Sequence, residues 1–152
     1  MSTLDNGSPN LADHESAAVE VAFLLDIFAT TIDDLMGGAI ASVSRIAGRN
    51  MARKFPVDMN HADVRIALEA VAEQLKGGFE ISHSCQKHSA ELTFNKCAIR
   101  KICQSRNTEL NGSICRLFHF YLDGVVNELH SRPVKSRITT TGERCTAHMD
   151  IK

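Results

Sequence analysis

The sequence predicts an α+β fold in which helices pack on an antiparallel sheet built from two hairpins, in the order ααα-ββ-αα-ββ. Apolar residues recur at helical spacing in the first half and over residues 114–130, and they alternate with polar ones over 79–94 and 134–151. With 152 residues, 43% of them hydrophobic, the chain is long enough for one domain with a core. We therefore expect a single domain over residues 15–152, preceded by a polar, disordered tail over residues 1–14.

Two helices are expected at the N-terminal end of the domain. Apolar spacing predicts the first over residues 15–29, and the sequence TTIDDL offers a fresh N-cap at Thr30 for a second helix that ends at Phe55. Close approach by another helix, or by a second copy of the chain, is indicated by a strip of small residues at positions 38, 41, 44, 47, 48 and 52. Four-residue spacing puts Arg45, Arg49 and Arg53 on one helix face, which indicates a solvated face or ion pairs within the protein.

The third helix leads into the first expected hairpin. Asn60 is predicted to cap this helix, and two glycines at 77–78 to end it. The sequences FEISHSC (79–85) and HSAELTF (88–94) then alternate on either side of a Gln-Lys turn, which is typical of an antiparallel pair of strands.

The C-terminal part is expected to contain two more helical segments and the second hairpin. A short helical turn follows Cys97, and the Asn-Gly-Ser sequence at 111–113 caps a long amphipathic helix over residues 114–130. The sequence VKSRITTTGERCTAHMDI (134–151) predicts strands around a Thr-Gly turn.

Composition argues against several classes of partner. The formal net charge of −1, from 17 basic and 18 acidic residues, gives no overall attraction to nucleic acid, and one Tyr with no Trp argues against a base-stacking platform. No apolar run reaches the roughly 20 residues of a membrane span, and the polar N-terminus does not resemble a signal peptide. We therefore expect a cytoplasmic protein whose five cysteines are reduced rather than joined in a disulfide framework.

Four of the five cysteines lie in the last third of the chain and are the main candidates for a site. Cys97, Cys103, Cys115 and Cys145 could form an all-thiolate site for zinc or an iron–sulfur cluster. His119 lies one turn beyond Cys115 and could replace one of the thiolates. The spacings C-x5-C and C-x11-C match no standard motif, so buried free thiols and a redox disulfide remain alternative interpretations.

The first hairpin carries a second group of metal-ligand types. His83, Cys85 and His88 could meet across this hairpin and bind zinc, copper or haem iron, or could simply be exposed at its tip. Between the helices and the sheet we expect an apolar ligand pocket, with a wall formed by Phe79, Leu92, Phe94, Phe118 and Leu122.

Three stretches together resemble the 4-vinyl reductase domain family. They are SRIAGRNMARKF (44–55), DVRIALEAVAEQLKGGFEISH (63–83) and ICRLFHFYLDGVVNELHSRPVKSRITTTGERCTAHMDI (114–151). The resemblance implies a compact α+β domain related to subunits of the TRAPP trafficking complex, used in bacteria and archaea to bind small molecules. Phenol-sensing members hold zinc with a Cys before the long helix and a Glu and two Cys in the last hairpin. Cys115 and Cys145 match the outer two positions, but the middle Glu and Cys are absent, so that zinc site does not carry over whole.

The function expected from these features is that of a sensory or ligand-binding module. A Cys-bound metal or cluster would fix the pocket, and the state of a hydrophobic small molecule or of the metal would be signalled through a homodimer or to a separate partner protein. The alternative is an enzyme or accessory protein that acts on a tetrapyrrole or another hydrophobic molecule. A third possibility, implied by the resemblance to trafficking-complex subunits, is a purely scaffolding role. The motifs of hydrolase, nucleotide and zinc-protease sites are missing, which favours binding over catalysis.

Overall fold

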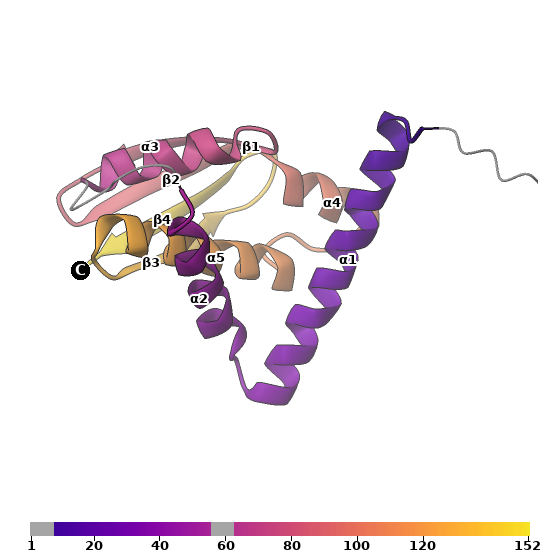
Figure 1. Ribbon diagram of the computed structural model, residues 1–152, viewed down its shortest axis with the longest axis horizontal. Helices are drawn as coiled ribbons and strands as arrows, with labels where there is room; N and C mark the ends of the chain where they lie inside the picture. Colours follow the sequence, from indigo (N-terminus) through magenta and orange to yellow (C-terminus); the bar gives the residue numbers. More distant parts are fainter. Residues whose placement is uncertain (1–7, 56–62) are drawn as a thin grey trace, which may run out of the picture.

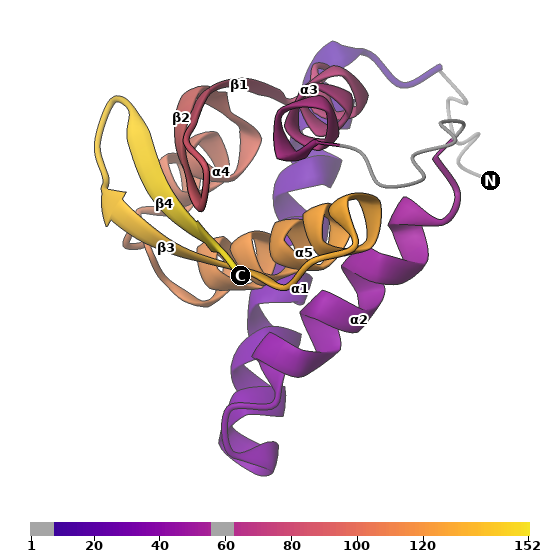
Figure 2. The same ribbon diagram turned by 90° about the vertical axis from the view of Figure 1, so that its left-hand side faces the viewer.

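The computed structural model describes residues 8–55 and 63–152, which form five helices and a four-stranded antiparallel sheet (Figures 1 and 2). This architecture confirms the predicted α+β class and the predicted order of elements. The elements are α1 (Leu11–Met36), α2 (Ile40–Ala52), α3 (Val64–Leu75), β1 (Phe79–Cys85), β2 (Ser89–Cys97), α4 (Ala98–Arg106), α5 (Ser113–His130), β3 (Val134–Thr140) and β4 (Cys145–Ile151).

The first helix continues through the point where the sequence predicted a break. The hydroxyl of Thr30 donates to the carbonyl of Asp26 one turn back (2.9 Å), and Thr31 makes the same bond one residue on, so neither begins a new helix. The chain turns instead at Gly37 and Gly38, whose φ angles of 60° and 83° are left-handed. No helix in the described part of the chain, the 26-residue α1 included, is long and apolar enough to cross a membrane.

Two helix starts also differ from the prediction. Asn10 and Asp13 form a reciprocal capping box, with bonds of 3.0 and 2.8 Å, so α1 begins at Leu11, inside the expected tail. Helix α3 is capped by Asp63, whose side chain accepts from the backbone N–H two residues on (3.1 Å). The cap predicted at Asn60 lies outside the described residues.

The two hairpins join through their inner strands into one sheet of order β1-β2-β4-β3. Helices α3 and α5 cover the same face of this sheet, with α3 over β1 and α5 over β3 (Figure 2). The alternation predicted from the sequence directs the apolar side chains of the strands to this face. The largest fully buried side chains of this core include Leu92, Phe94, Met149, Val125 and Val126.

Helices α2 and α5 cross at two glycines. A Cβ atom on Gly48 would lie 2.0 Å from the carbonyl oxygen of Tyr121, and one on Gly124 would lie 2.1 Å from the carbonyl oxygen of Arg45. Such distances leave no room for any side chain at either position, so the two backbones touch. Ser44, Gly48 and Ala52 of the predicted small-residue strip are buried and form the helix-packing face, whereas Gly38 and Ala47 are exposed.

Candidate functional site

A small cavity lies at the end of the sheet where β2 passes into α4. The beginning of α5 and the last hairpin close it from the other sides. Its volume is about 20 Å³, which is room for about one water molecule. The side chains around it are mostly apolar or thiol groups: Phe94, Cys97, Ile99, Arg100, Leu110, Asn111, Cys115, Phe118, His119, Ile138, Thr141 and Cys145.

Three of the four candidate metal-ligating cysteines line this cavity, and the fourth lies next to it. Cys97 ends β2, and its Sγ accepts from the N–H of Arg100 (3.4 Å), so the thiol caps α4. Cys145 reaches the same end of the sheet because it pairs in register with Phe94 of the neighbouring strand. Cys115 enters from the first turn of α5, and the buried Cys103 of α4 lies close to its thiol.

The surroundings of these thiols favour the neutral form. Burial raises the pKa of the Cys115 thiol to about 12 and also raises the pKa of Cys97. The guanidinium of Arg100 lies 3.9 Å from the sulfur of Cys145. That guanidinium also donates to two backbone carbonyls, at 3.1 and 2.8 Å, which are better acceptors than a thiol. At neutral pH Cys97 and Cys115 therefore present uncharged thiols to the cavity.

As placed, these donors do not fit a metal centre. Within residues 8–55 and 63–152, no group of three or more His, Cys, Asp or Glu side chains is positioned to hold one metal ion. A structural zinc site takes four ligands, and its cysteines bind as thiolates. The zinc or iron–sulfur site expected from the sequence therefore stays a prediction.

His119 is the unusual polar residue of the cavity wall. Its ring is 9% exposed and meets the rings of Phe94 and Phe118 edge-on, with centroid distances of 5.2 and 5.8 Å. Burial lowers the pKa of His119 to about 4, so the ring is neutral at pH 7. Among the described residues, its buried Nδ1 atom has no hydrogen-bond partner. Such an atom costs about 1–3 kcal/mol unless a further group satisfies it.

The lowered pKa of His119 gives a testable pH dependence of stability. Its contribution is fully present above pH 6.5, the ordinary pKa, and is lost as the pH falls toward 4, because only the unfolded chain then binds the proton. The difference between the ordinary pKa of 6.5 and the folded-state pKa of about 4 corresponds to about 3 kcal/mol of unfolding free energy. Urea denaturation of the wild type and of His119→Leu at pH 7.0 and 4.5 should show a smaller acid loss in the variant. Equal losses would contradict the assignment.

The predicted apolar pocket is only partly the cavity that forms. Phe94 and Phe118 line it, whereas Phe79 stacks on Phe118 from behind, at 4.5 Å between ring centroids. Leu92 and Leu122 belong to the buried core and do not reach the cavity wall. Sequence reasoning missed Ile99, Arg100, Leu110, Ile138 and Thr141, since nothing in the local pattern shows that these segments meet.

The group predicted on the first hairpin does not converge. His83 Nδ1 lies 3.6 Å from the sulfur of Cys85, but His88 is exposed after the turn. In the part of the chain that the structure describes, these three residues form no metal site.

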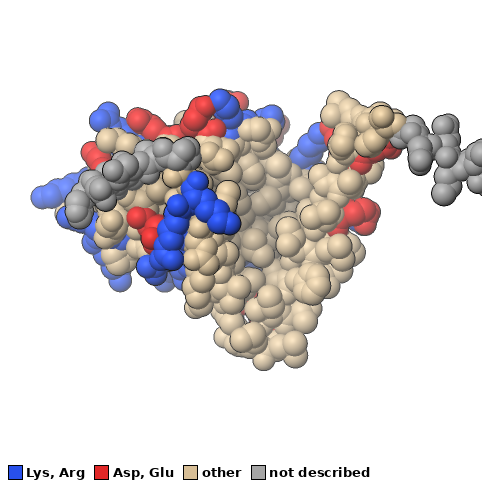
Figure 3. Space-filling view, viewed as in Figure 1, with Lys and Arg blue, Asp and Glu red and all other residues tan. Residues whose placement is uncertain are grey.

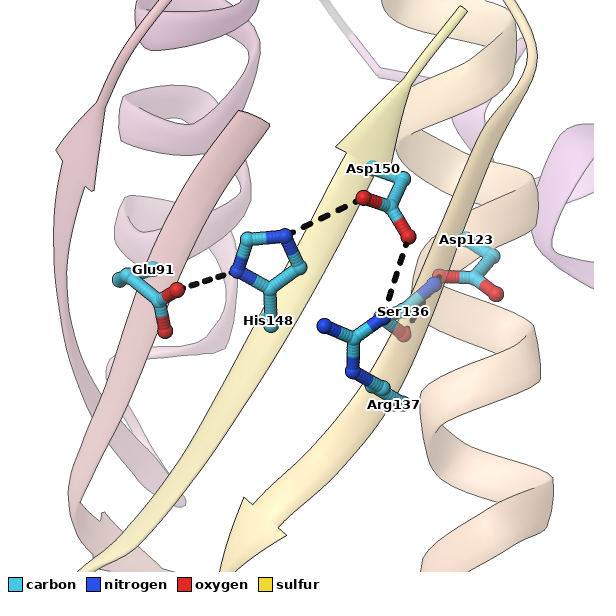
Figure 4. A network of polar contacts seen from close by, with 6 residues as sticks. All are labelled: Glu91, Asp123, Ser136, Arg137, His148 and Asp150. Atoms are coloured by element: carbon cyan, nitrogen blue, oxygen red, sulfur yellow. Dashed lines mark hydrogen bonds and ion pairs between the residues drawn. The ribbon is translucent and has the colours of Figure 1, made fainter. Parts of the chain in front are cut away.

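The outer face of the sheet carries a charged network that the sequence did not reveal (Figure 4). His148 bonds through Nε2 to Asp150 (3.1 Å) and through Nδ1 to Glu91 on the neighbouring strand, and Arg137 pairs with Asp150 at 3.4 Å. The hydrogen bond that His148 donates to the Glu91 carboxylate raises the pKa of His148 above its ordinary value. His148 thus links β2 to β4.

A second polar cluster, centred on the fully buried Asp123, lies behind the sheet. The Asp123 carboxylate on α5 accepts from the N–H and the hydroxyl of Ser136 on β3, at 3.0 and 2.6 Å (Figure 4). Arg45 of α2 pairs with the other oxygen at 3.3 Å. Burial raises the pKa of Asp123, although both partners oppose that shift. With Arg49 and Arg53 paired to Glu128, the basic face of α2 forms the predicted ion pairs within the protein.

Comparison with known proteins identifies the fold. A scan against protein-family models gives no match, and a search of curated proteins finds none either. Among solved structures, a trafficking protein particle complex subunit 3 from Naegleria fowleri, covalently bound to palmitic acid, matches with a TM-score of 0.57 and 9% identity, over 94% of this chain and 97% of that one. The phenol-responsive sensory domain of the transcription activator PoxR, with phenol, matches with a TM-score of 0.53 and 10% identity, over 86% and 74%. The fold is thus shared with a trafficking-complex subunit, as predicted, whereas membership of the 4-vinyl reductase family stays a prediction.

Proposed function

We propose that this protein binds a small apolar molecule that carries one hydrogen-bonding group, in the cavity between β2, α5 and the last hairpin. The observation that carries the proposal is the buried Nδ1 of His119, which lacks a partner among the described residues in a wall made mostly of phenyl rings, aliphatic groups and thiols. Pockets for small ligands combine such an apolar lining with a few polar groups that fix orientation. A ligand hydroxyl at Nδ1 would satisfy the atom that the protein leaves unpaired.

The size of the cavity favours a compact ligand. Any molecule larger than water requires the wall to move, because the volume is only about 20 Å³. Two wall segments lie outside the regular elements, at Asn111 before α5 and at Thr141 in the hairpin turn. These two segments can be displaced at a lower free-energy cost than the packed elements of the core can be separated. The solved structures of this fold with phenol and with palmitic acid support an apolar ligand, and the small volume favours one of the size of phenol.

Phenol and toluene together test the proposal, since they differ by one hydroxyl at nearly equal size. By titration calorimetry, the wild type should bind phenol more tightly than toluene. His119→Leu should weaken phenol binding by roughly tenfold, which corresponds to one net hydrogen bond of about 1.4 kcal/mol. The affinity for toluene should be unchanged or higher in this variant, because the substitution removes a buried polar group.

His88→Leu is the matched control, since it replaces an exposed histidine on the first hairpin and should leave both affinities unchanged. Wild-type protein that binds neither compound would overturn the proposal. So would a His119→Leu variant that binds phenol as tightly as the wild type.

The thiol metal site is the second candidate. What favours it is that Cys97, Cys115 and Cys145 surround one cavity with Cys103 behind them, although their present spacing does not suit a metal. Anaerobic purification followed by measurement of zinc and iron tests it. About one bound metal or cluster per chain that is lost in Cys115→Ser would support the metal site. Metal-free wild type, or full metal content in Cys115→Ser, would reject it.

The first turn of α5 connects the cavity to α1, so ligand binding in the cavity could change the contacts of α1. The carboxylate of Asp26 on α1 accepts from the N–H of Ile114 (3.1 Å), and Thr30 on α1 bonds to the hydroxyl of Ser113 (3.0 Å). The next residue of α5, Cys115, lines the cavity. A ligand that displaces this turn would therefore change its contacts with α1. This is the route that supports a sensory role over the alternative of an enzyme or accessory for tetrapyrrole chemistry.

A further inference from the structure

Helix α1 carries two parallel packing faces, and only one of them is used within the chain. The face toward the domain is built from small or polar residues at spacings of three and four: Val19, Ala22, Asp26, Ala29 and Asp33. Beside it runs a second face with the same spacing and larger side chains: Ala18, Val21, Leu25, Phe28, Ile32 and Leu35. We call this second set the α1 seam.

The α1 seam is largely exposed to solvent. Val21 is 57% exposed, Phe28 63% and Leu35 80%, although these are the side chains whose burial would contribute most to stability. On α2, after the turn, Val43 and Ile46 are also exposed, at 44% and 58%. Figure 3 shows the apex where α1 and α2 meet as a continuous area without Lys, Arg, Asp or Glu on the side facing the viewer.

The size of this surface exceeds what a monomer ordinarily exposes. Among the residues described, eight large apolar side chains on or beside the seam are more than a third exposed: Val21, Leu24, Leu25, Phe28, Leu35 and Met36 of α1, and Val43 and Ile46 of α2. At about 100 Å² each, roughly half of what a large aromatic side chain buries, they amount to on the order of 800 Å². The largest apolar patch of a typical monomer is about 300–600 Å². A standard interface buries about 800 Å² on each partner, so this surface is sufficient for one.

We infer that the α1 seam is the interface with a second copy of this chain. Two helices pack along each other when apolar residues recur on both at alternating spacings of three and four residues. The seam has this spacing, so the seams of two copies of the chain can pack against each other. The acidic residues Glu15 and Glu20 of α1 do not oppose such a dimer, because they form ion pairs with Lys101 and Arg106 of their own chain.

A membrane surface fits this helix poorly as an alternative. Helices that lie on anionic membranes carry Lys and Arg along their polar face. Helix α1 contains neither residue and has six acids between Leu11 and Met36. The inference does not rest on the proposed ligand, because the seam lies on the helix itself and outside the cavity wall.

The oligomeric state of the complete chain tests the inference. Sedimentation equilibrium at about 50 μM, well above a micromolar dissociation constant, should give twice the chain mass of 16.7 kDa. Phe28→Glu and Leu35→Glu should each weaken association by at least about 100-fold, because two-fold symmetry places each uncompensated charge in the interface twice. Leu35→Glu is the safer variant for folding, since this side chain makes the least contact with its own domain.

Ile66→Glu is the matched control, because it charges an exposed apolar residue on α3, away from the seam, and should leave the dimer intact. Circular dichroism should show unchanged helix content in all three variants. A wild type that sediments at the monomer mass would overturn the inference. So would a folded Leu35→Glu variant that still dimerises like the wild type.

Discussion

Gly124→Ala is expected to destabilise the protein by about 3 kcal/mol or more, although alanine is the better helix former by about 1 kcal/mol. The new Cβ would lie 2.1 Å from the carbonyl oxygen of Arg45 and 2.8 Å from its Cα. Both of these are backbone atoms, so no side-chain rotation can relieve the clash. Helices α2 and α5 would have to separate along their whole crossing, which opens the core between them. Urea denaturation followed by circular dichroism measures the loss.

Gly77→Ala is the control for this prediction. A Cβ at Gly77 meets nothing within 4 Å, and the residue lies just after α3 without a left-handed φ angle. We expect its stability to stay within about 0.5 kcal/mol of the wild type, as for most surface changes. If Gly124→Ala were as stable as Gly77→Ala, the close crossing of α2 and α5 would be wrong.

Asp123→Ala is expected to cost about 3–5 kcal/mol, because it removes one partner from a buried, charged cluster. The fully buried carboxylate satisfies the backbone N–H and the hydroxyl of Ser136, and it neutralises Arg45. Without it, the Ser136 N–H loses its partner in the core, and the strand β3 loses its polar link to α5. Thermal and urea denaturation at pH 7 measure the difference.

Glu128→Ala is the matched comparison, since Glu128 also joins α5 to arginines of α2 but lies nearer the surface. Its bonds with Arg49 and Arg53 are 3.1 and 2.8 Å, yet both arginine side chains are at least half exposed. Such pairs contribute about 0–1 kcal/mol. A loss for Glu128→Ala as large as that for Asp123→Ala would show that burial does not decide the energy of these contacts.

The sequence alone was sufficient for the order and type of the elements, because each depends on contacts close in the chain. The alternation of apolar and polar residues in FEISHSC, and the helical spacing of apolar residues over 114–130, indicate which face of each element is buried. They do so whichever other element packs against that face. Errors arose where two local signals competed. Thr30 could have capped a new helix, but its hydroxyl bonds back within α1, and the glycines at 37–38 end that helix.

The tertiary structure decided which distant groups meet. Pairing of β2 with β4, which no local pattern specifies, places Cys145 opposite Phe94 and beside Cys97 and Cys115. Burial then determines the chemistry of that end of the sheet, since it keeps the Cys115 thiol protonated and leaves His119 uncharged. The sequence by itself determined which chemical groups were available for a site. Their protonation and their spacing depend on desolvation and long-range strand pairing, which exist only once the chain has folded.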